Sequence, residues 1–113
     1  MKRLTDKDRQ KTLQTELSRV LSILIHEYKA EQVYLYGSLA HGTVTQWSDL
    51  DLVVIKGTNK SFCDRVAEIL AMLKPRVGMD ILVYTPGEWE TLCKERLFVR
   101  KEIIENGKQL YAA

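Results

Sequence analysis

The chain is poor in the residues that hold small proteins together through covalent bonds or metal clusters. Its 113 residues include only two cysteines, Cys63 and Cys93, and neither belongs to a CxxC motif or a Cys/His cluster. This spacing argues against a zinc site, and a chain of this length can bury a core without a disulfide. We therefore expect reduced thiols, as in a cytoplasmic protein.

Long apolar runs and a strong charge of one sign are also missing. No run approaches the ~18 residues of a membrane span, and the charged N-terminus lacks the apolar segment of a signal peptide. The net charge of +2 is too small to favour nucleic-acid binding by bulk electrostatics. With 45% hydrophobic residues and no visible linker or repeat, residues 1–113 are expected to form one domain.

Apolar periodicity predicts helices alternating with short strands. Apolar residues at three-and-four spacing predict a long amphipathic helix over about 5–28, capped by Thr5 or Asp6. Further helices are expected from Ser61 to a stop at Pro75, and from Thr85 to Asn106-Gly107 with a break near 95–97. Strands are predicted at 33–36, 50–55 and 79–84, with room for one helical turn before the second and a short edge strand at 109–111. The fold class is therefore α/β (α+β), a small mixed sheet flanked by helices.

Two carboxylates, Asp49 and Asp51, stand one residue apart where the second strand begins. Side chains alternate along a strand, so both should share a face. Burial of two like charges is costly, yet Val53 and Ile55 continue that face as apolar residues, as in the floor of a pocket. Two such carboxylates can share one divalent ion or hold two ions roughly 3.5–4 Å apart. The sequence thus favours a metal site over exposed positions on an amphipathic strand.

A glycine-containing turn precedes the acid pair. Gly37-Ser38 ends the first strand, and Gly42 follows four residues after Ser38. Glycine lets backbone approach a ligand closely, and the amides of a strand-to-helix turn can bind an anion, with the Ser38 hydroxyl as a further donor. Alone this pattern indicates a plain turn, but with the acids it predicts the phosphate half of a metal–nucleotide site.

A third acid, Asp80, opens the otherwise apolar strand MDILVY. A third carboxylate can hold a metal and orient or deprotonate an attacking hydroxyl. The alternative is an aspartate that merely ends the Arg76-Val77-Gly78 turn.

These residues resemble a known family. Gly37-Ser38, ten intervening residues and Asp49-Leu50-Asp51 are similar to the GSx10DxD signature of the DNA polymerase β-like nucleotidyltransferase superfamily. The string YGSLAHGTVTQWSDLDLVV looks most like the minimal nucleotidyltransferases of bacteria and archaea, and MDILVYTPGEWE resembles their third-acid strand and following helix. The resemblance spans about residues 33–90.

The resemblance implies Mg²⁺-dependent transfer of a nucleoside monophosphate, most typically AMP from ATP, with two Mg²⁺ ions. It implies that Asp49 and Asp51 bind both metals and that Asp80 serves the metal on the nucleophile side. The nucleotide would be held by a stretch that includes Gly37, Ser38, His41, Gly42 and Ser48. Relatives usually carry Arg or Lys at position 41, so His41 is either a weaker phosphate contact or a loop residue without a role.

The resemblance also implies a partner. Minimal members are similar to antitoxins that transfer AMP to a tyrosine of a HEPN-domain ribonuclease toxin. Two alternatives stay open, namely an antitoxin that acts by binding alone, and a transferase acting on a small molecule or an RNA end. Because 113 residues leave no room for a substrate-recognition domain, acceptor specificity is expected from a partner or from assembly of subunits. Trp47 is expected to pack beneath its loop rather than stack on a base, and Trp89 to lie in the core.

Overall fold

The computed structural model describes residues 5–113, which form a four-stranded sheet with helices on both faces. The elements in chain order are α1 (Asp6–His26), β1 (Gln32–Tyr36), α2 (Ser38–His41), β2 (Leu50–Ile55), α3 (Phe62–Leu73), β3 (Met79–Tyr84), α4 (Pro86–Glu95), the π-helix η1 (Val99–Glu105) and β4 (Lys108–Ala112). The strand order is β3-β2-β1-β4. Strands β2 and β3 are parallel, whereas β1 is antiparallel to both β2 and β4, so the sheet is mixed as predicted.

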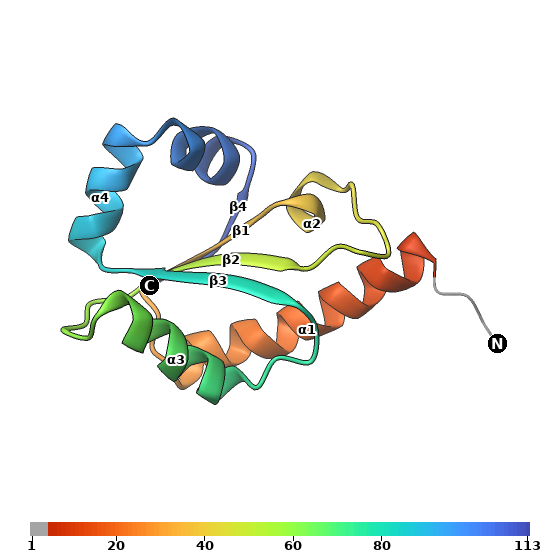
Figure 1. Cartoon of the computed structure of the whole chain (residues 1–113), viewed down its shortest axis with the longest axis horizontal. Coiled ribbons are helices and arrows are strands. Elements are labelled where there is room, and N and C mark those ends of the chain that lie inside the picture. Colours follow the sequence, from red (N-terminus) through yellow and green to blue (C-terminus); the bar gives the residue numbers. More distant parts are fainter. Residues whose placement is uncertain (1–4) are drawn as a thin grey trace.

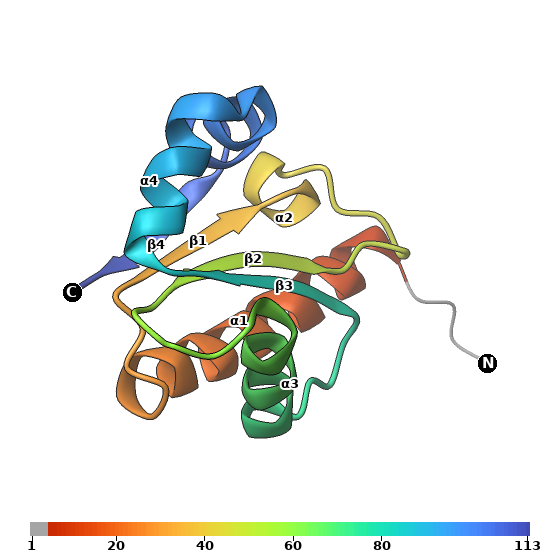
Figure 2. The same ribbon diagram turned by 60° about the vertical axis from the view of Figure 1, so that its left-hand side comes forward.

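The helices form two layers around this sheet. Helices α1 and α3 lie beneath it in Figure 1, α4 and η1 lie on the opposite side, and the short α2 lies at one end of the sheet, with Leu39 and Ala40 packed in the same core as α1 and α3. The turned view of Figure 2 shows the same separation. The end of β1 and the starts of β2 and β3 meet at one end of the sheet, beside α2 and the start of α1 (Figure 1).

Strand β2 divides the core between the two layers. Leu50, Leu52 and Val54 are fully buried in the cluster shared with α1 and α3. Val53 and Ile55 are fully buried in the cluster shared with α4 and η1. Because neighbouring residues face opposite ways, Asp51 shares the second face, and the predicted change from acid to apolar core along that face is confirmed.

Side-chain caps begin the helices where the sequence predicts. Thr5 caps α1 in a capping box with Asp8, and Ser61 accepts a hydrogen bond from the Asp64 amide at the start of α3. Thr85 and Glu88 form a second capping box, with Pro86 in the first helical turn of α4. These caps satisfy amides that have no partner within the helix, which is why short polar residues mark the boundaries.

The C-terminal helical segment differs from the prediction in its type. Helix α4 ends at Glu95, at the predicted break, but the second part is a π-helix. At its end Gly107 packs so closely that a β-carbon there would lie 2.6 Å from the Leu35 carbonyl oxygen of β1. The π-helix has no apolar-periodicity signal of its own, because its 7 residues are too few to distinguish the wider π turn from an α turn.

Within residues 5–113, no helix combines the length and apolar character needed to cross a membrane.

Candidate active site

The strand register places two of the predicted acids next to each other. Asp51 of β2 pairs with Asp80 of β3 in the parallel ladder and with Tyr36 of β1 in the antiparallel ladder. The three side chains therefore form a row across the sheet on the side of α4 and η1. Two elements far apart in sequence supply the two carboxylates, as the third-acid prediction requires.

The surroundings of the Asp51 carboxyl disfavour its ionised form. Burial, followed by the nearby charges of Asp80 and Asp49, raises the pKa of the Asp51 carboxyl to about 6. Among residues 5–113, no cationic side chain forms an ion pair with it. Burial also raises the pKa of the Tyr36 hydroxyl, with smaller contributions from Asp80 and Asp51. The row is thus a partly buried cluster of negative potential, which a bound cation would neutralise.

Gly37 is required by the position of the Asp51 carboxylate. A β-carbon at Gly37 would lie 2.1 Å from Asp51 Oδ2, far inside van der Waals contact. Its backbone, with φ 77° and ψ −157°, also occupies a region that is essentially restricted to glycine. The turn after β1 therefore has two independent reasons to carry glycine, and both bring the turn against the acid pair.

Asp49 takes a different position from Asp51. It precedes the first residue of β2, and its Oδ1 accepts a hydrogen bond of 3.2 Å from Arg9 Nη2. A β-carbon at Gly78 would lie 2.3 Å from the same Oδ1, so this carboxylate also rests against a glycine. Within the described chain, no three His, Cys, Asp or Glu side chains are grouped closely enough to hold a metal ion. The structure therefore pairs Asp51 with Asp80 and holds Asp49 to one side, toward α1.

The predicted nucleotide-binding residues lie in and after the short helix α2. Ser38 begins α2, and Gly42 ends it with φ 75°, in the left-handed region that favours glycine. His41 Nε2 lies 3.9 Å from a carboxylate oxygen of Glu102 on η1. The Ser48 hydroxyl accepts a hydrogen bond from the Thr45 amide and so shapes the loop before the acids. Their roles toward a nucleotide stay predictions.

The prediction that Trp89 lies in the core is confirmed, whereas the prediction that Trp47 packs beneath its loop is not. Trp89 is buried among Tyr34 and Tyr84, as expected of a core residue. The packing interpretation of Trp47 is wrong, because its side chain is 81% exposed on the loop before Asp49. The loop is held by hydrogen bonds of Gln46 and Ser48 instead, so it needs no aromatic anchor.

Several residues of the site were not found from the sequence. Tyr36 carries a weak signal, since it is the strand residue directly before Gly37 and so must lie near the turn. Gly78 was seen only as a turn residue. Arg9 and Glu102 carry no local signal, because they reach the site from distant helices through tertiary contacts.

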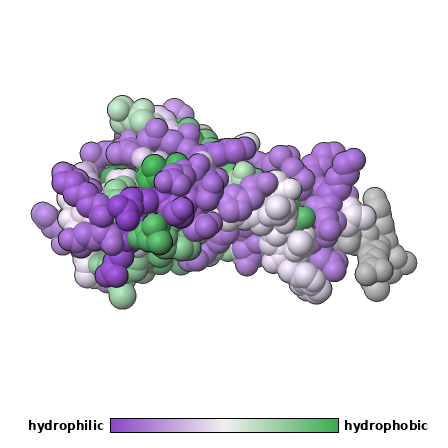
Figure 3. All heavy atoms as spheres, turned by 90° about the horizontal axis from the view of Figure 1, so that it is seen from above, coloured by the Kyte–Doolittle hydropathy of each residue, from purple (hydrophilic) through white to green (hydrophobic). Residues whose placement is uncertain are grey.

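Exposed apolar side chains border the same face of the sheet. The Phe98 ring packs edge-on against Tyr36, with centroids 6.3 Å apart, and yet Phe98 is 58% exposed. Leu97 beside it is 60% exposed, and Ile104 of η1 is also exposed. In Figure 3, which views the molecule from the side of α4 and η1, apolar atoms gather in the half of this face farther from the N-terminal end.

Comparison with known proteins identifies the class. A family model described as "Polymerase beta, Nucleotidyltransferase" matches residues 18–113. The chain therefore belongs to the polymerase β-type nucleotidyltransferase family, as the motif resemblance indicated. No protein of curated function matches the sequence.

Solved structures agree on the fold. A protein from Sulfolobus solfataricus described as a nucleotidyltransferase is 19% identical, with a TM-score of 0.68 over 98% of this chain and 90% of that chain. A toxin–antitoxin structure with AMP-PNP is 20% identical, with a TM-score of 0.51 over 85% of this chain and 73% of that chain. A mutant MntA-HpeT toxin–antitoxin structure is 21% identical, with a TM-score of 0.48 over 85% of this chain and 72% of that chain. At such identities the likeness concerns the fold.

Proposed function

We propose that this nucleotidyltransferase uses Mg²⁺ to transfer AMP from ATP to a protein partner and thereby acts as an antitoxin. The observation that carries the proposal is the pair Asp51 and Asp80, side by side on parallel strands, with no ion pair to either carboxylate from a side chain of residues 5–113. Burial, and then the charges of Asp80 and Asp49, raise the pKa of the Asp51 carboxyl, so its ionised form is disfavoured without a compensating cation. Adjacent carboxylates that supply hard oxygen ligands and whose ionised form is disfavoured by their surroundings suit a divalent ion.

The residues that would hold the ions are Asp49, Asp51 and Asp80. Bound Mg²⁺ would neutralise charge on the phosphates and on the attacking oxygen. Asp49 is close enough for its charge to contribute to the raised pKa of Asp51, and the hydrogen bond from Arg9 engages only Oδ1 of its carboxylate. The three carboxylates supply the hard oxygen ligands that Mg²⁺ prefers.

The chain's own residues would then divide the work of transfer. The Gly37-Ser38 turn presents backbone amides and the Ser38 hydroxyl to the triphosphate. The acceptor oxygen bonds to the α-phosphorus while the bond from that phosphorus to the pyrophosphate oxygen breaks. Asp80 orients the acceptor hydroxyl and takes its proton. His41, paired with Glu102, is placed at the end of α2 and can add a charge-assisted contact when protonated.

A protein acceptor is supported by the surface beside the acids. Leu97, Phe98 and Ile104 are exposed, and Phe98 contacts Tyr36, the neighbour of Asp51. Apolar side chains at the rim of a polar site suit a protein partner better than a small polar metabolite. The toxin–antitoxin structure with AMP-PNP, together with what the motif resemblance implies, makes a toxin with a HEPN domain the first acceptor to test.

The test is transfer of labelled AMP to such a partner. The protein is incubated with α-³²P-ATP, Mg²⁺ and a candidate HEPN-domain partner, and products are followed by gel and by intact mass. We expect label on the partner with wild type, none with Asp51→Asn, and normal labelling with Asp64→Asn, an exposed aspartate on α3. Neutralisation of the toxin without any label would mean that the protein acts by binding alone. Labelling of a small molecule or RNA instead would overturn the protein acceptor.

A further inference from the structure

The start of α1 is bound to the loop that carries Asp49. Asp6 Oδ1 accepts a hydrogen bond of 2.9 Å from the Gln46 amide. Arg9 donates through Nε to the Ser48 carbonyl oxygen at 2.8 Å and through Nη2 to Asp49 Oδ1 at 3.2 Å. Loop positions 46, 48 and 49 are thus hydrogen-bonded to the N-terminal end of α1, about forty residues earlier in the chain.

The helix end that makes these contacts is itself well ordered. The capping box of Thr5 and Asp8 satisfies the first amides of α1. Arg9 follows directly, and Leu13 one turn later is fully buried under the sheet. The guanidinium therefore projects from a backbone that is held by both its cap and its core contacts. Figure 1 shows this end of α1 beside the loop between α2 and β2.

We propose that Arg9 is a positioning residue for Asp49, and this inference rests on the metal-dependent function proposed above. The planar guanidinium carries its donors in a fixed fork, so one nitrogen holds the Ser48 backbone while another aims the next residue's carboxylate. Only Oδ1 is engaged, and Oδ2 is left for an ion. Residues that orient metal ligands in this way typically contribute 10–100-fold to metal affinity or activity.

The opposite role for Arg9 would be competition with the ion. A guanidinium held only by Asp49 would occupy the ion's place and leave when the ion arrives. The Nε bond to the Ser48 carbonyl argues against this, because Arg9 would have to release the loop backbone as well as the carboxylate. The two roles predict opposite effects of removing Arg9. Positioning predicts weaker ion binding, and competition predicts tighter binding.

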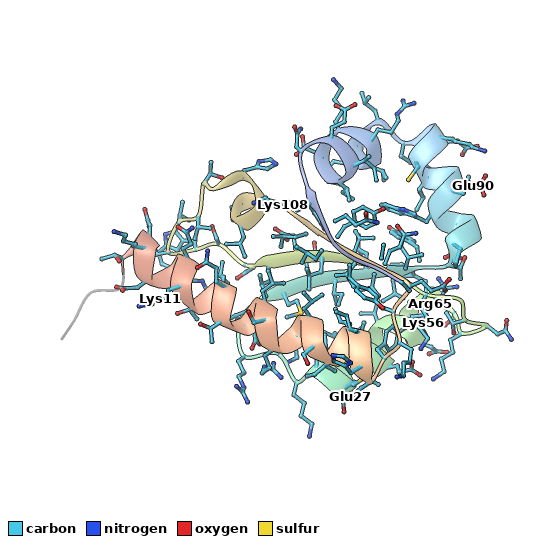
Figure 4. All side chains as sticks on the ribbon, turned by 180° about the vertical axis from the view of Figure 1, so that it is seen from behind. Lys11, Glu27, Lys56, Arg65, Glu90 and Lys108 are labelled. Atoms are coloured by element: carbon cyan, nitrogen blue, oxygen red, sulfur yellow. The ribbon has the colours of Figure 1, made fainter. Side chains whose placement is uncertain are left out.

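The experiment compares wild type, Arg9→Ala, Arg9→Lys and Lys11→Ala. Lys11 is exposed on α1 (Figure 4) and carries the same charge as Arg9, two residues away in the sequence. Its removal therefore controls for the loss of one positive charge. Mn²⁺ affinity is measured by electron paramagnetic resonance, and amide exchange of residues 43–49 by mass spectrometry on the metal-free proteins. Circular dichroism confirms folding, since a surface ion pair contributes only about 0–1 kcal/mol.

For Arg9→Ala we expect faster exchange in the loop and a Mn²⁺ dissociation constant raised about 10-fold or more. Arg9→Lys should lie between this variant and wild type, and Lys11→Ala should match wild type. Unchanged loop exchange in Arg9→Ala, or an equal or tighter Mn²⁺ affinity, would overturn the positioning role. Absence of Mn²⁺ binding by wild type itself would instead refute the metal-dependent function, and the role of Arg9 with it.

Discussion

Glu16 and Asp51 are two carboxylates withdrawn from solvent, and their neighbours have opposite charge. Glu16, 4% exposed, accepts hydrogen bonds from Arg19 at 2.7 and 2.9 Å and from the Arg76 amide at 2.6 Å. These partners, the Arg19 hydrogen bond first, lower the pKa of the Glu16 carboxyl. Asp51 faces Asp80 and Asp49, and burial, followed by these two charges, raises the pKa of its carboxyl. The charge of Glu16 is therefore compensated by groups of the protein itself, whereas the charge of Asp51 would be compensated only by a bound cation.

The difference separates structural acids from candidate catalytic acids. A buried carboxylate that is paired and hydrogen-bonded inside the protein has its charge compensated, and loss of these contacts costs stability because polar groups are left unpaired. A carboxylate left among like charges costs stability and is retained for another reason. Burial alone does not make the distinction, since Glu16 is more deeply buried than Asp51.

Removal of Asp80 should have the largest effect, and on transfer alone. If Asp80 orients the acceptor and takes its proton, Asp80→Ala should slow AMP transfer by about 10²–10⁴-fold and leave most of the ATP affinity. Single-turnover labelling and calorimetric titration of Mg·ATP measure the two quantities. Equal losses in both would show that Asp80 binds nucleotide rather than serving the acceptor.

Removal of the charge of Glu16 should affect stability and not transfer. Glu16→Gln weakens three hydrogen bonds to a charged acceptor, and we expect a loss of about 2–3 kcal/mol in the free energy of unfolding. Urea denaturation measures it, with Glu27→Gln as a control at the exposed C-terminal cap of α1 (Figure 4). Impaired transfer by a folded Glu16→Gln protein would contradict a purely structural role for Glu16.

Gly37→Ala tests whether the glycine turn and Asp51 form one unit. The added β-carbon would collide with Asp51 Oδ2 and strain a backbone region that costs about 1–3 kcal/mol for other residues. We expect weaker Mg·ATP binding than in Ser38→Ala, which removes one hydrogen bond worth about 0.5–1.5 kcal/mol. The affinities are measured by calorimetry. Weaker binding by Ser38→Ala than by Gly37→Ala would mean that the fit of Gly37 against Asp51 is not needed for nucleotide binding.

Asp51→Asn should give the smallest change in the free energy of unfolding, and the size of this change should depend on pH. The pKa of Asp51 is raised from 3.8 to about 6 in the folded protein, so the fold binds this proton more tightly than the unfolded chain does. Stability is therefore lost as pH rises from about 4 through 6. After allowance for solvent screening, Asp51→Asn should gain on the order of 1 kcal/mol at about pH 7.5, or about 4 °C in Tm, and nothing at about pH 4. A gain that is independent of pH would contradict the charge argument.

Local patterns were sufficient to predict the elements and the two strands that carry the acids. The caps at Thr5, Ser61 and Thr85 and the apolar alternation of β2 depend on neighbours in the chain, so they can be read without a structure. The same applies to the glycine turn and to the placement of Asp80 at a strand start. The family followed from the spacing of Gly37-Ser38 and the acid pair.

Tertiary structure alone decided which charges meet. The parallel register sets Asp51 beside Asp80, and Arg9 reaches Asp49 from a helix forty residues away. The same holds for Glu102 beside His41, for the exposed Trp47, and for the π-helix that closes against β1. Periodicity reports the face on which a side chain lies, but not its partner across space. The pKa of a carboxyl, and with it the distinction between Glu16 and Asp51, depends on that partner.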